Sequence, residues 1–539
     1  MSVRRRTTPA VAIAALLALG LTACGGAAEE EEVDVTGNTV GAMEDFKVGD
    51  TFTATQALDF SMLYSDSPSY AYNADWMVWD EITKRSNVTL DPTIVPAADY
   101  EQKRSLLIGA GDAPSIIPKT YPGQDTPFVA SGAVLAVSDY VDLMPNFQAK
   151  VKEWNLEANL DTLRQADGKF YLLPGLHEDP WQDYTVGMRT DVMADLGLEA
   201  PESWADFHDV LAAIKAEYPD SYPFSDRFFG DNILGLVAQD FGTSAGKWSY
   251  KNATWNPESE EFEFTGSMPA YKETIEYFKA LVDEGLMDPE SFTQDEDTAI
   301  QKFTTGKSFA ISANAQMVVN DYRSALTAAV PGATVGKIPL PSAAIAGTTR
   351  LENGIMLNAN VVESENFVAL MQFIDWLWYS DEGQEMTKWG VEGTTYTKGS
   401  DGTFTLAADV DYVGLNPTAT KHLQKDFGFA GGVFAYGGTT ELLQSTFSEE
   451  EIGFQDEMVK KDLLPIPPSF PFDDLEREQV TLWETPLTDY TKQMALQFIL
   501  GQRDLGEWDN YVAELEGKGA TDYIELVNSA HKRFEETTG

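Results

Sequence analysis

The segment Gly242-Thr243-Ser244-Ala245-Gly246 is the first place where residue types and spacing could do chemistry. A Gly-x-Ser-x-Gly pattern can hold a serine nucleophile on a tight turn, provided that a strand precedes the turn and a helix follows it. Here residues 233–241 have a helical pattern, and Gly246-Lys247-Trp248 leads into a loop. The surroundings therefore argue against a serine hydrolase, since short Gly/Ser patterns recur by chance.

Other catalytic or metal chemistry has little support. The chain has 4 histidines and 1 cysteine, with neither a His-Glu-x-x-His pattern nor a cysteine cluster that would bind zinc. A glycosidase needs two carboxyl groups at a set separation, and among 86 acidic residues some pair always looks suitable. We expect no catalytic residue, no cofactor and no metal ion, and we keep a hydrolase as the alternative.

Cys24 carries the clearest chemical signal. It follows three arginines, 4–6, and an apolar run over residues 10–21, which is shorter than the about 20 residues that cross a bilayer. The sequence Leu21-Thr22-Ala23-Cys24 resembles a bacterial lipobox. The resemblance implies that residues 1–23 are a signal peptide, and that Cys24 is lipidated and acylated, as with palmitate. An ordinary signal peptide with an incidental cysteine is the alternative.

The charge of the chain excludes one class of partner. Net charge is −49, and removal of the signal peptide, which holds three arginines and no acid, makes it −52. Such a chain repels phosphate backbones, so we expect no nucleic-acid partner. It also repels anionic lipid, so membrane contact would run through the lipid anchor alone. Residues 24–50 include Glu29-Glu30-Glu31-Glu32 and few apolar side chains, which predicts a flexible tether.

The remaining chain alternates strand-like and helix-like patterns, typical of α/β proteins with mostly parallel sheets. Strands are expected over 57–64, 88–94, 115–117, 335–338 and 354–357. Ser203, with Asp206 three residues later, predicts a helix start. Residues 367–378 predict a buried helix, and the chain after residue 475 is mostly helical. Trp204, Trp376 and Trp378 are expected in the core.

Several motifs in chain order resemble one family. They are Gly109–Ser115, Asp167–Pro174, Met188–Asp191, the segment Phe303–Ser312, Trp389–Tyr396 and the tail from Gly501 to Ala530. Together they resemble carbohydrate-type extracellular solute-binding proteins of ABC importers. Within that family they are most similar to a long subgroup that includes lipoprotein LipO-like and alginate-oligosaccharide-binding proteins. The motifs cover nearly the whole globular body and are specific for the family, not for a ligand.

The resemblance implies an α/β, bilobal, periplasmic-binding-protein-like (Venus-flytrap) fold with hinge crossings and a helical C-terminal extension. We expect an N-terminal lobe of residues 51–175 plus 345–395 and a C-terminal lobe of 176–344 plus 396–539. Many long-subgroup members bind calcium in an acidic loop, but Lys215–Phe224 lacks the closely spaced acids that calcium needs. We therefore expect no calcium there.

Ligands of open α/β sheets bind beyond the carboxyl ends of strands, which points to the loops after the predicted strands. Aromatic rings stack on the apolar faces of sugars, and polar side chains bind the hydroxyl rim. For Arg189 and Glu392 the alternative to ligand binding is a structural role as an ion-pair or cap residue. For Trp76 the alternative is a place in the core, and for His177 it is a place in the hinge. The predicted binding residues are Tyr64, Ser67, Tyr70, Tyr72, Trp76, Lys119, Tyr121, His177, Glu178, Trp181, Arg189, Asn314, Gln316 and Glu392.

The sequence therefore predicts a monomeric, lipid-anchored, extracytoplasmic protein at the bacterial cell membrane that captures an oligosaccharide for ABC importer permeases. Because the chain is acidic, a neutral sugar is favoured over a uronate, although Lys119 and Arg189 could pair with a carboxylate. A surface glycoside hydrolase or other hydrolase lipoprotein is the alternative function. A sensor or adhesin lipoprotein would share the fold.

Overall fold

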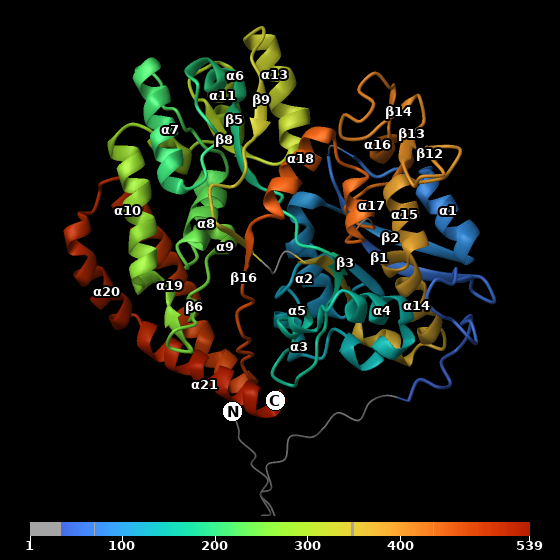
Figure 1. The fold of residues 1–539 in the computed structure, drawn as a ribbon. Coiled ribbons are helices and arrows are strands. Elements are labelled where there is room, and N and C mark those ends of the chain that lie inside the picture. Colours follow the sequence, from blue (N-terminus) through green and yellow to red (C-terminus); the bar gives the residue numbers. More distant parts are fainter. Residues whose placement is uncertain (1–33, 69, 347–349, 435, 539) are drawn as a thin grey trace, which may run out of the picture. The chain divides into compact units, whose positions relative to one another are not determined.

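The computed structural model describes residues 34–68, 70–346, 350–434 and 436–538, and Val35–Gly539 forms one compact unit (Figure 1). The predicted signal peptide and Cys24 lie outside the described residues. The described part of the predicted tether is packed and not extended. The Met43 N–H donates to the Gln372 side chain (2.9 Å), and the ring of Phe46 lies 6.0 Å from that of Phe52. These apolar side chains supply the contacts that the acidic composition obscured.

The first sheet has five strands in the order β2-β1-β3-β11-β4. β1 pairs parallel with β2 and β3, while β11 pairs antiparallel with β3 and β4. The strands predicted at 57–64, 88–94, 115–117 and 354–357 are all present in this sheet. Its members are β1 (Leu58–Asp66), β2 (Val88–Pro96), β3 (Ile116–Thr120), β4 (Leu173–Leu176) and β11 (Leu351–Leu357).

The second sheet has three strands in the order β8-β5-β9, and both pairs are antiparallel. The expectation of mostly parallel sheets is therefore wrong for this part of the chain. More than a hundred residues separate β5 from its partners, and a connection of that length lets a strand enter from either end of the sheet. The strands are β5 (Thr185–Arg189), β8 (Ala310–Ala313) and β9 (Val335–Lys337).

Four two-stranded pairs complete the sheet structure. β6 (Ala253–Asn256) with β7 (Glu261–Phe264) and β12 (Tyr396–Lys398) with β13 (Phe404–Leu406) are antiparallel. β10 (Ala344–Ala346) with β16 (Asp462–Leu464) and β14 (Val410–Asp411) with β15 (Lys421–His422) are parallel.

Helices surround both sheets (Figure 1). The chain up to β5 contains α1 (Met77–Ser86), α2 (Tyr100–Ala110), α3 (Thr126–Val129), α4 (Pro145–Glu153) and α5 (Glu157–Asp161). Between β5 and β9 lie α6 (Thr190–Leu196), α7 (Trp204–Glu217), α8 (Asp231–Asp240), α9 (Gly246–Ser249), α10 (Pro269–Asp283), α11 (Glu296–Thr304), α12 (Ala315–Met317) and α13 (Arg323–Ala329). After β11 come α14 (Phe367–Ile374), α15 (Asp381–Trp389), α16 (Leu423–Phe427), α17 (Thr440–Gln444), α18 (Glu449–Met458), α19 (Asp474–Ile499), α20 (Trp508–Gly517) and α21 (Ala520–Thr538).

Two predicted helices illustrate why the local structure forms. The Ser203 hydroxyl accepts from the Asp206 N–H, and the Asp206 carboxylate accepts from the Ser203 N–H, so the predicted capping box is confirmed. Residues 367–378 form α14 and a π-helical turn (Asp375–Tyr379), with every side chain buried. The continuous apolar run predicted that burial.

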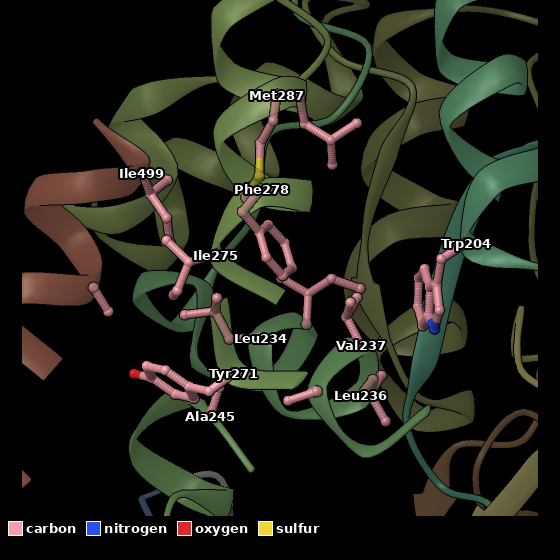
Figure 2. Close-up of a cluster of buried hydrophobic side chains, with 14 of the residues drawn as sticks. Trp204, Leu234, Leu236, Val237, Ala245, Tyr271, Ile275, Phe278, Met287 and Ile499 are labelled. Atoms are coloured by element: carbon pink, nitrogen blue, oxygen red, sulfur yellow. The ribbon is translucent and has the colours of Figure 1, made fainter. Parts of the chain in front are cut away.

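Two large hydrophobic clusters form the core. One joins α7, α8 and α10 to the C-terminal helices, and Figure 2 shows its centre, where Tyr271, Ile275 and Phe278 of α10 face α8 and Ile499. Trp204 belongs to it and is 2 % exposed. The other cluster surrounds the five-stranded sheet and includes Trp376 and Trp378. The core role predicted for these three tryptophans is therefore confirmed.

The segment between α15 and α18 packs against the five-stranded sheet. Phe429, Phe434 and Tyr436 are buried in the cluster that also holds Phe60 of β1. The predicted lobe boundaries place this segment in the C-terminal lobe. The lobe boundaries stay a prediction. Within the described ranges, none of the helices combines the length and apolar character needed to span a bilayer.

Candidate functional site

Aromatic side chains meet edge to face at the end of β1 and in the segment that follows it. The Tyr64 ring centroid lies 5.4 Å from that of Tyr72 and 5.9 Å from that of Trp79, and Trp79 lies 5.5 Å from Phe434. Trp76 lies beneath them, 2 % exposed, and its indole N–H donates to the Lys425 carbonyl. Trp76 therefore supports the ring cluster and has almost no surface for a ligand.

Tyr70 connects this loop to the far side of the site. Its ring stacks on His422 at 5.3 Å, and its N–H donates to the Ser67 carbonyl (3.0 Å). Burial raises the pKa of Tyr70, and a side-chain hydrogen bond with Gln316 opposes that shift. Gln316 lies on α12, directly after β8. The structure thus brings together two predicted residues from different sheets.

Lys119 lies near the end of β3, and Tyr121 follows that strand directly. Lys119 has a left-handed backbone (φ 55°), and its carbonyl accepts from the buried Arg104 (2.7 Å), which holds that conformation. Burial lowers the pKa of Lys119, whereas the Glu352 carboxylate raises it. Tyr121 is 48 % exposed, a large fraction for an aromatic ring, and is free to meet a ligand.

His177 and Glu352 form the polar centre where β4 ends and the antiparallel β11 begins. His177 is 2 % exposed, and its Nε2 lies 3.0 Å from Oε2 of Glu352. Burial opposes ionisation of Glu352, but the His177 contact and Lys388 lower its pKa on balance. Burial also lowers the pKa of Lys388 to about 8. The buried His177 and the Glu352 carboxylate fix each other's orientation, so His177 positions Glu352 and has little surface for a ligand.

The chain after His177 runs through two further predicted residues. The Glu178 carboxylate accepts from the Thr440 N–H (2.8 Å), and its carbonyl accepts from Arg350. Trp181 is half-buried, with its ring 5.9 Å from His177 and 6.1 Å from Phe447. Both residues line the crossing between the two sheets.

Asn314 meets this crossing from the second sheet. Its side-chain N–H donates to Asp183 (3.4 Å), and its carbonyl oxygen caps α12 by accepting from the Met317 N–H. Burial raises the pKa of Asp183 to about 6, against the opposing effects of Lys337 and Asn314. Lys337 is in turn paired with Glu451 at 2.9 Å, and both side chains are buried.

Two predicted residues have other surroundings. Arg189 is 6 % exposed and pairs with both carboxylate oxygens of Asp191 (2.8 and 2.6 Å). Glu392 is exposed in the turn before β12, where its backbone forms an isolated β-bridge with that of Tyr396. The Arg189–Asp191 pair matches the ion-pair role given as the alternative for Arg189, whereas the backbone bridge of Glu392 is neither an ion pair nor a cap.

Three aromatic residues beside the second sheet are not among the predicted binding residues. The Tyr184 ring lies 6.2 Å from Phe228 and 5.9 Å from Trp248, and the last two lie 4.7 Å apart. Trp248 is 51 % exposed. The sequence signal for an exposed ring here is the position of Trp248 two residues after Gly246, the last glycine of the Gly-x-Ser-x-Gly motif.

That motif has the wrong surroundings for a serine nucleophile. Helix α8, not a strand, precedes Gly242, and Ser244 Oγ accepts from the Lys251 N–H (3.0 Å). Among the described residues, no group of three or more His, Cys, Asp or Glu side chains could hold a metal ion. In the Lys215–Phe224 stretch the Lys215 ammonium donates to the Ser221 carbonyl (2.6 Å).

Two hollows lie away from these residues. One of about 360 Å³ is lined by Leu198–Glu202 and by α7, and one of about 210 Å³ lies over Phe60 and Leu370. Neither contains a predicted binding residue. The candidate site is therefore the set of strand-end loops, not one of these hollows.

The chain matches the bacterial extracellular solute-binding protein family over residues 67–385, more than half of its length, and it belongs to that family. Its fold is the bilobal α/β fold of solute-binding proteins, as predicted. This fold is similar to the crystal structure of the alginate-binding protein AlgQ2 without calcium ion. The two superpose with a TM-score of 0.67 at 18% identity, covering 90% of this chain and 100% of AlgQ2.

Two curated relatives carry names that state which sugars they bind. The chain is 25% identical over 335 residues to the polygalacturonan/rhamnogalacturonan-binding protein YtcQ of Bacillus subtilis (strain 168), covering 60% of this chain and 64% of YtcQ. It is 22% identical over 561 residues to the fructooligosaccharide ABC transporter substrate-binding protein FusA of Streptococcus pneumoniae serotype 4, covering 98% of each chain. Both relatives are binding proteins.

Proposed function

We propose that this chain captures an oligosaccharide between its two lobes and delivers it to the permease subunits of an ABC importer. The observation that carries the proposal is the presence of aromatic rings and uncharged hydrogen-bonding groups at the strand ends: Tyr64, Tyr72 and Trp79 cluster at the end of β1, and the Asn314 side chain follows β8. This combination suits a sugar. Family membership and the sugar-binding relatives support it.

In this proposal the predicted binding residues line or support the sugar site, and they differ in how accessible they are to a ligand. Tyr70, Tyr121, Trp181, Asn314 and Gln316 offer accessible rings or polar groups at the strand ends. Tyr64, Ser67, Tyr72, Trp76, Lys119, His177 and Glu178 shape and support that surface, and Arg189 and Glu392 contribute least.

The test of this proposal is a thermal-shift screen of the compact unit Val35–Gly539 against kestose, maltotriose, cellotriose and trigalacturonate. A ligand that binds only the folded state raises the melting temperature by mass action. A concentration-dependent rise with a sugar supports the proposal, and we expect the neutral sugars to give it. No shift with any saccharide contradicts it.

We also propose that the protein binds without turnover. The relatives named above are binding proteins, and the serine motif lacks the surroundings of a nucleophile. Chromatography of the sugar after prolonged incubation with purified protein tests this. An unchanged sugar is expected, whereas hydrolysis products would favour the surface hydrolase.

The lipid anchor is a proposal that rests on the sequence around Cys24. Several acyl chains hold a protein at a membrane far more stably than one. Expression of the full chain and of Cys24→Ser in a bacterial host, followed by fractionation, tests it. The unmodified chain is expected in the membrane fraction with a mass increase at Cys24. Equal distribution of both proteins would argue for an ordinary signal peptide.

A further inference from the structure

The Gly-x-Ser-x-Gly segment has a structural purpose that the proposed function leaves unexplained. Gly246 has a left-handed backbone (φ 72°), and a Cβ atom there would collide with the Asp231 carbonyl oxygen. The Lys247 N–H donates to the Asp231 carboxylate (2.8 Å), and the Ser244 hydroxyl accepts from Lys251. The segment is therefore fastened to the start of α8.

This fastening holds one residue in an unusual position. Trp248 lies within the short helix α9 and exposes 51 % of its surface, although an indole is one of the most costly side chains to leave in water. Its ring centroid lies 4.7 Å from Phe228 and 5.9 Å from Tyr184. The three rings form a contiguous group, which we call the aromatic platform.

The second ring of the platform comes from a strained turn. Phe228, Phe229 and Gly230 all have left-handed backbones (φ 58°, 56° and 74°), a conformation that L side chains other than Asn and Asp rarely adopt. Two such phenylalanines in sequence persist only when surrounding contacts fix them. The guanidinium of Arg227 supplies one, because it lies 4.3 Å from the Phe228 ring centroid.

Arg227 is itself held firmly. It is 2 % exposed, forms an ion pair with Glu296, and donates to the Tyr322 hydroxyl (2.6 Å). Its charge is therefore used within the protein. Lys247 and Lys492 both lie near the Asp231 carboxylate, and Lys492 also lies near Asp489. Each of these cations near the platform therefore has a carboxylate beside it, which favours an uncharged ligand over an anion.

The platform adjoins the candidate site. Tyr184 follows Asp183 directly in the chain, and the Asp183 carboxylate accepts from the side-chain N–H of Asn314 (3.4 Å). Asn314 follows β8 and is one of the predicted binding residues. Tyr184 therefore connects the platform to the strand-end residues of the candidate site.

We propose that Trp248, backed by Phe228 and Tyr184, is the platform on which an uncharged sugar ring of the bound oligosaccharide stacks. This inference rests on the proposed function and names a binding residue and a substrate class for that site. The strained turn and the Gly246 contact pre-organise the rings, so little side-chain freedom is lost when the sugar binds.

The test is calorimetric titration of Val35–Gly539 and its variants with kestose, maltotriose, cellotriose and trigalacturonate. Trp248→Ala is expected to weaken binding of the preferred neutral sugar by about tenfold or more, as for other exposed aromatic anchors. Trp248→Phe keeps a ring and is expected to lose less. Tyr222→Ala removes a comparably exposed ring (41 %) that packs over Lys215 instead, and should bind like the parent.

The outcomes are distinguishable. If the parent protein binds none of the sugars, the proposed function fails. If the parent binds and Trp248→Ala binds within about twofold of it, the platform inference alone fails. Tighter binding of trigalacturonate than of every neutral sugar overturns the uncharged class. Melting temperatures of the ligand-free variants show whether each is folded, and Trp248→Phe keeps the test valid if Trp248→Ala is not.

Discussion

Asp183 is a carboxyl group whose surroundings favour its protonated form. Burial raises its pKa to about 6, above the value of about 3.9 in an unfolded chain. As pH rises from about 4 to about 6, the unfolded state therefore loses this proton first, and the stability that the protonated form contributes is lost. The free energy of unfolding should fall over this range for this group.

We predict that Asp183→Asn, which keeps an acceptor for Asn314, makes the free energy of unfolding less dependent on pH between about 4 and 6. Urea unfolding at several pH values measures this slope. Asp226, whose pKa burial also raises to about 6, remains in the variant, so the slope should be reduced and not abolished. An unchanged slope would show that Asp183 titrates normally.

The Lys337–Glu451 pair is the clearest case of buried charge in the described residues. The two side chains are 4 % and 5 % exposed, and the Lys337 ammonium also lies 3.7 Å from the Phe454 ring centroid. Removing one charge leaves the other without its partner in a poorly solvated place. A single substitution should therefore be more harmful than a double one.

We predict that Glu451→Gln lowers the free energy of unfolding by about 3 kcal/mol, and that Lys337→Met with Glu451→Leu costs much less. Urea unfolding of the single and double variants measures the coupling. The exposed pair Arg323–Glu450 is the matched control, and Glu450→Gln should cost about 0.5 kcal/mol. Equal effects at positions 450 and 451 would contradict the role of burial.

At the scale of elements, short sequence patterns succeeded where the deciding contacts are local. Ser203 and Asp206 are three residues apart, and the helix start they predict is present with both capping hydrogen bonds. The direction of β8 and β9 relative to β5 was not predictable in this way. Partners far apart in sequence decide it.

We predict that Ser203→Ala lowers the free energy of unfolding by about 1 kcal/mol, because the Asp206 N–H loses its acceptor. Chemical denaturation measures the change. Ser259→Ala is the control: this exposed serine uses only its backbone N–H, which donates to Asn256. A loss at position 259 as large as that at 203 would show that the cap is not responsible.

At the scale of the whole molecule, the bilobal fold predicts a hinge motion. Ligands of such proteins bind between lobes, and closure requires contacts that both lobes share with the ligand. A side-chain hydrogen bond between Tyr70 and Gln316 links the loop after β1 to α12, which follows β8. A sugar that contacts the aromatic platform and Tyr121 would add to it.

We predict that a saturating concentration of the preferred sugar decreases the radius of gyration of Val35–Gly539 in small-angle X-ray scattering. Trp248→Ala at a concentration that saturates it should show a smaller decrease, because one lobe loses part of its hold on the ligand. Binding without any change in radius would mean that the sugar occupies one lobe alone or an already closed form.

The sequence determined the family, the α/β class, the long buried helix over 367–378 and the core positions of Trp204, Trp376 and Trp378. These features depend on hydrophobic periodicity, caps and motif order, which act over a few residues. The packing of Met43 and Phe46 against the core does not follow from the acidic composition, because composition alone conceals a few well-placed apolar contacts.

Only the tertiary structure decided which candidate residues meet. His177 and Glu352 are 175 residues apart and form one polar centre, whereas Trp76 is covered by its neighbours and Arg189 is paired with Asp191. The tertiary structure also shows that the Gly-x-Ser-x-Gly motif, which begins at Gly242, contacts the start of α8 and so supports Trp248. The physical reason is that exposure and pairing depend on chain segments that folding brings together from distant positions, and no local pattern records them.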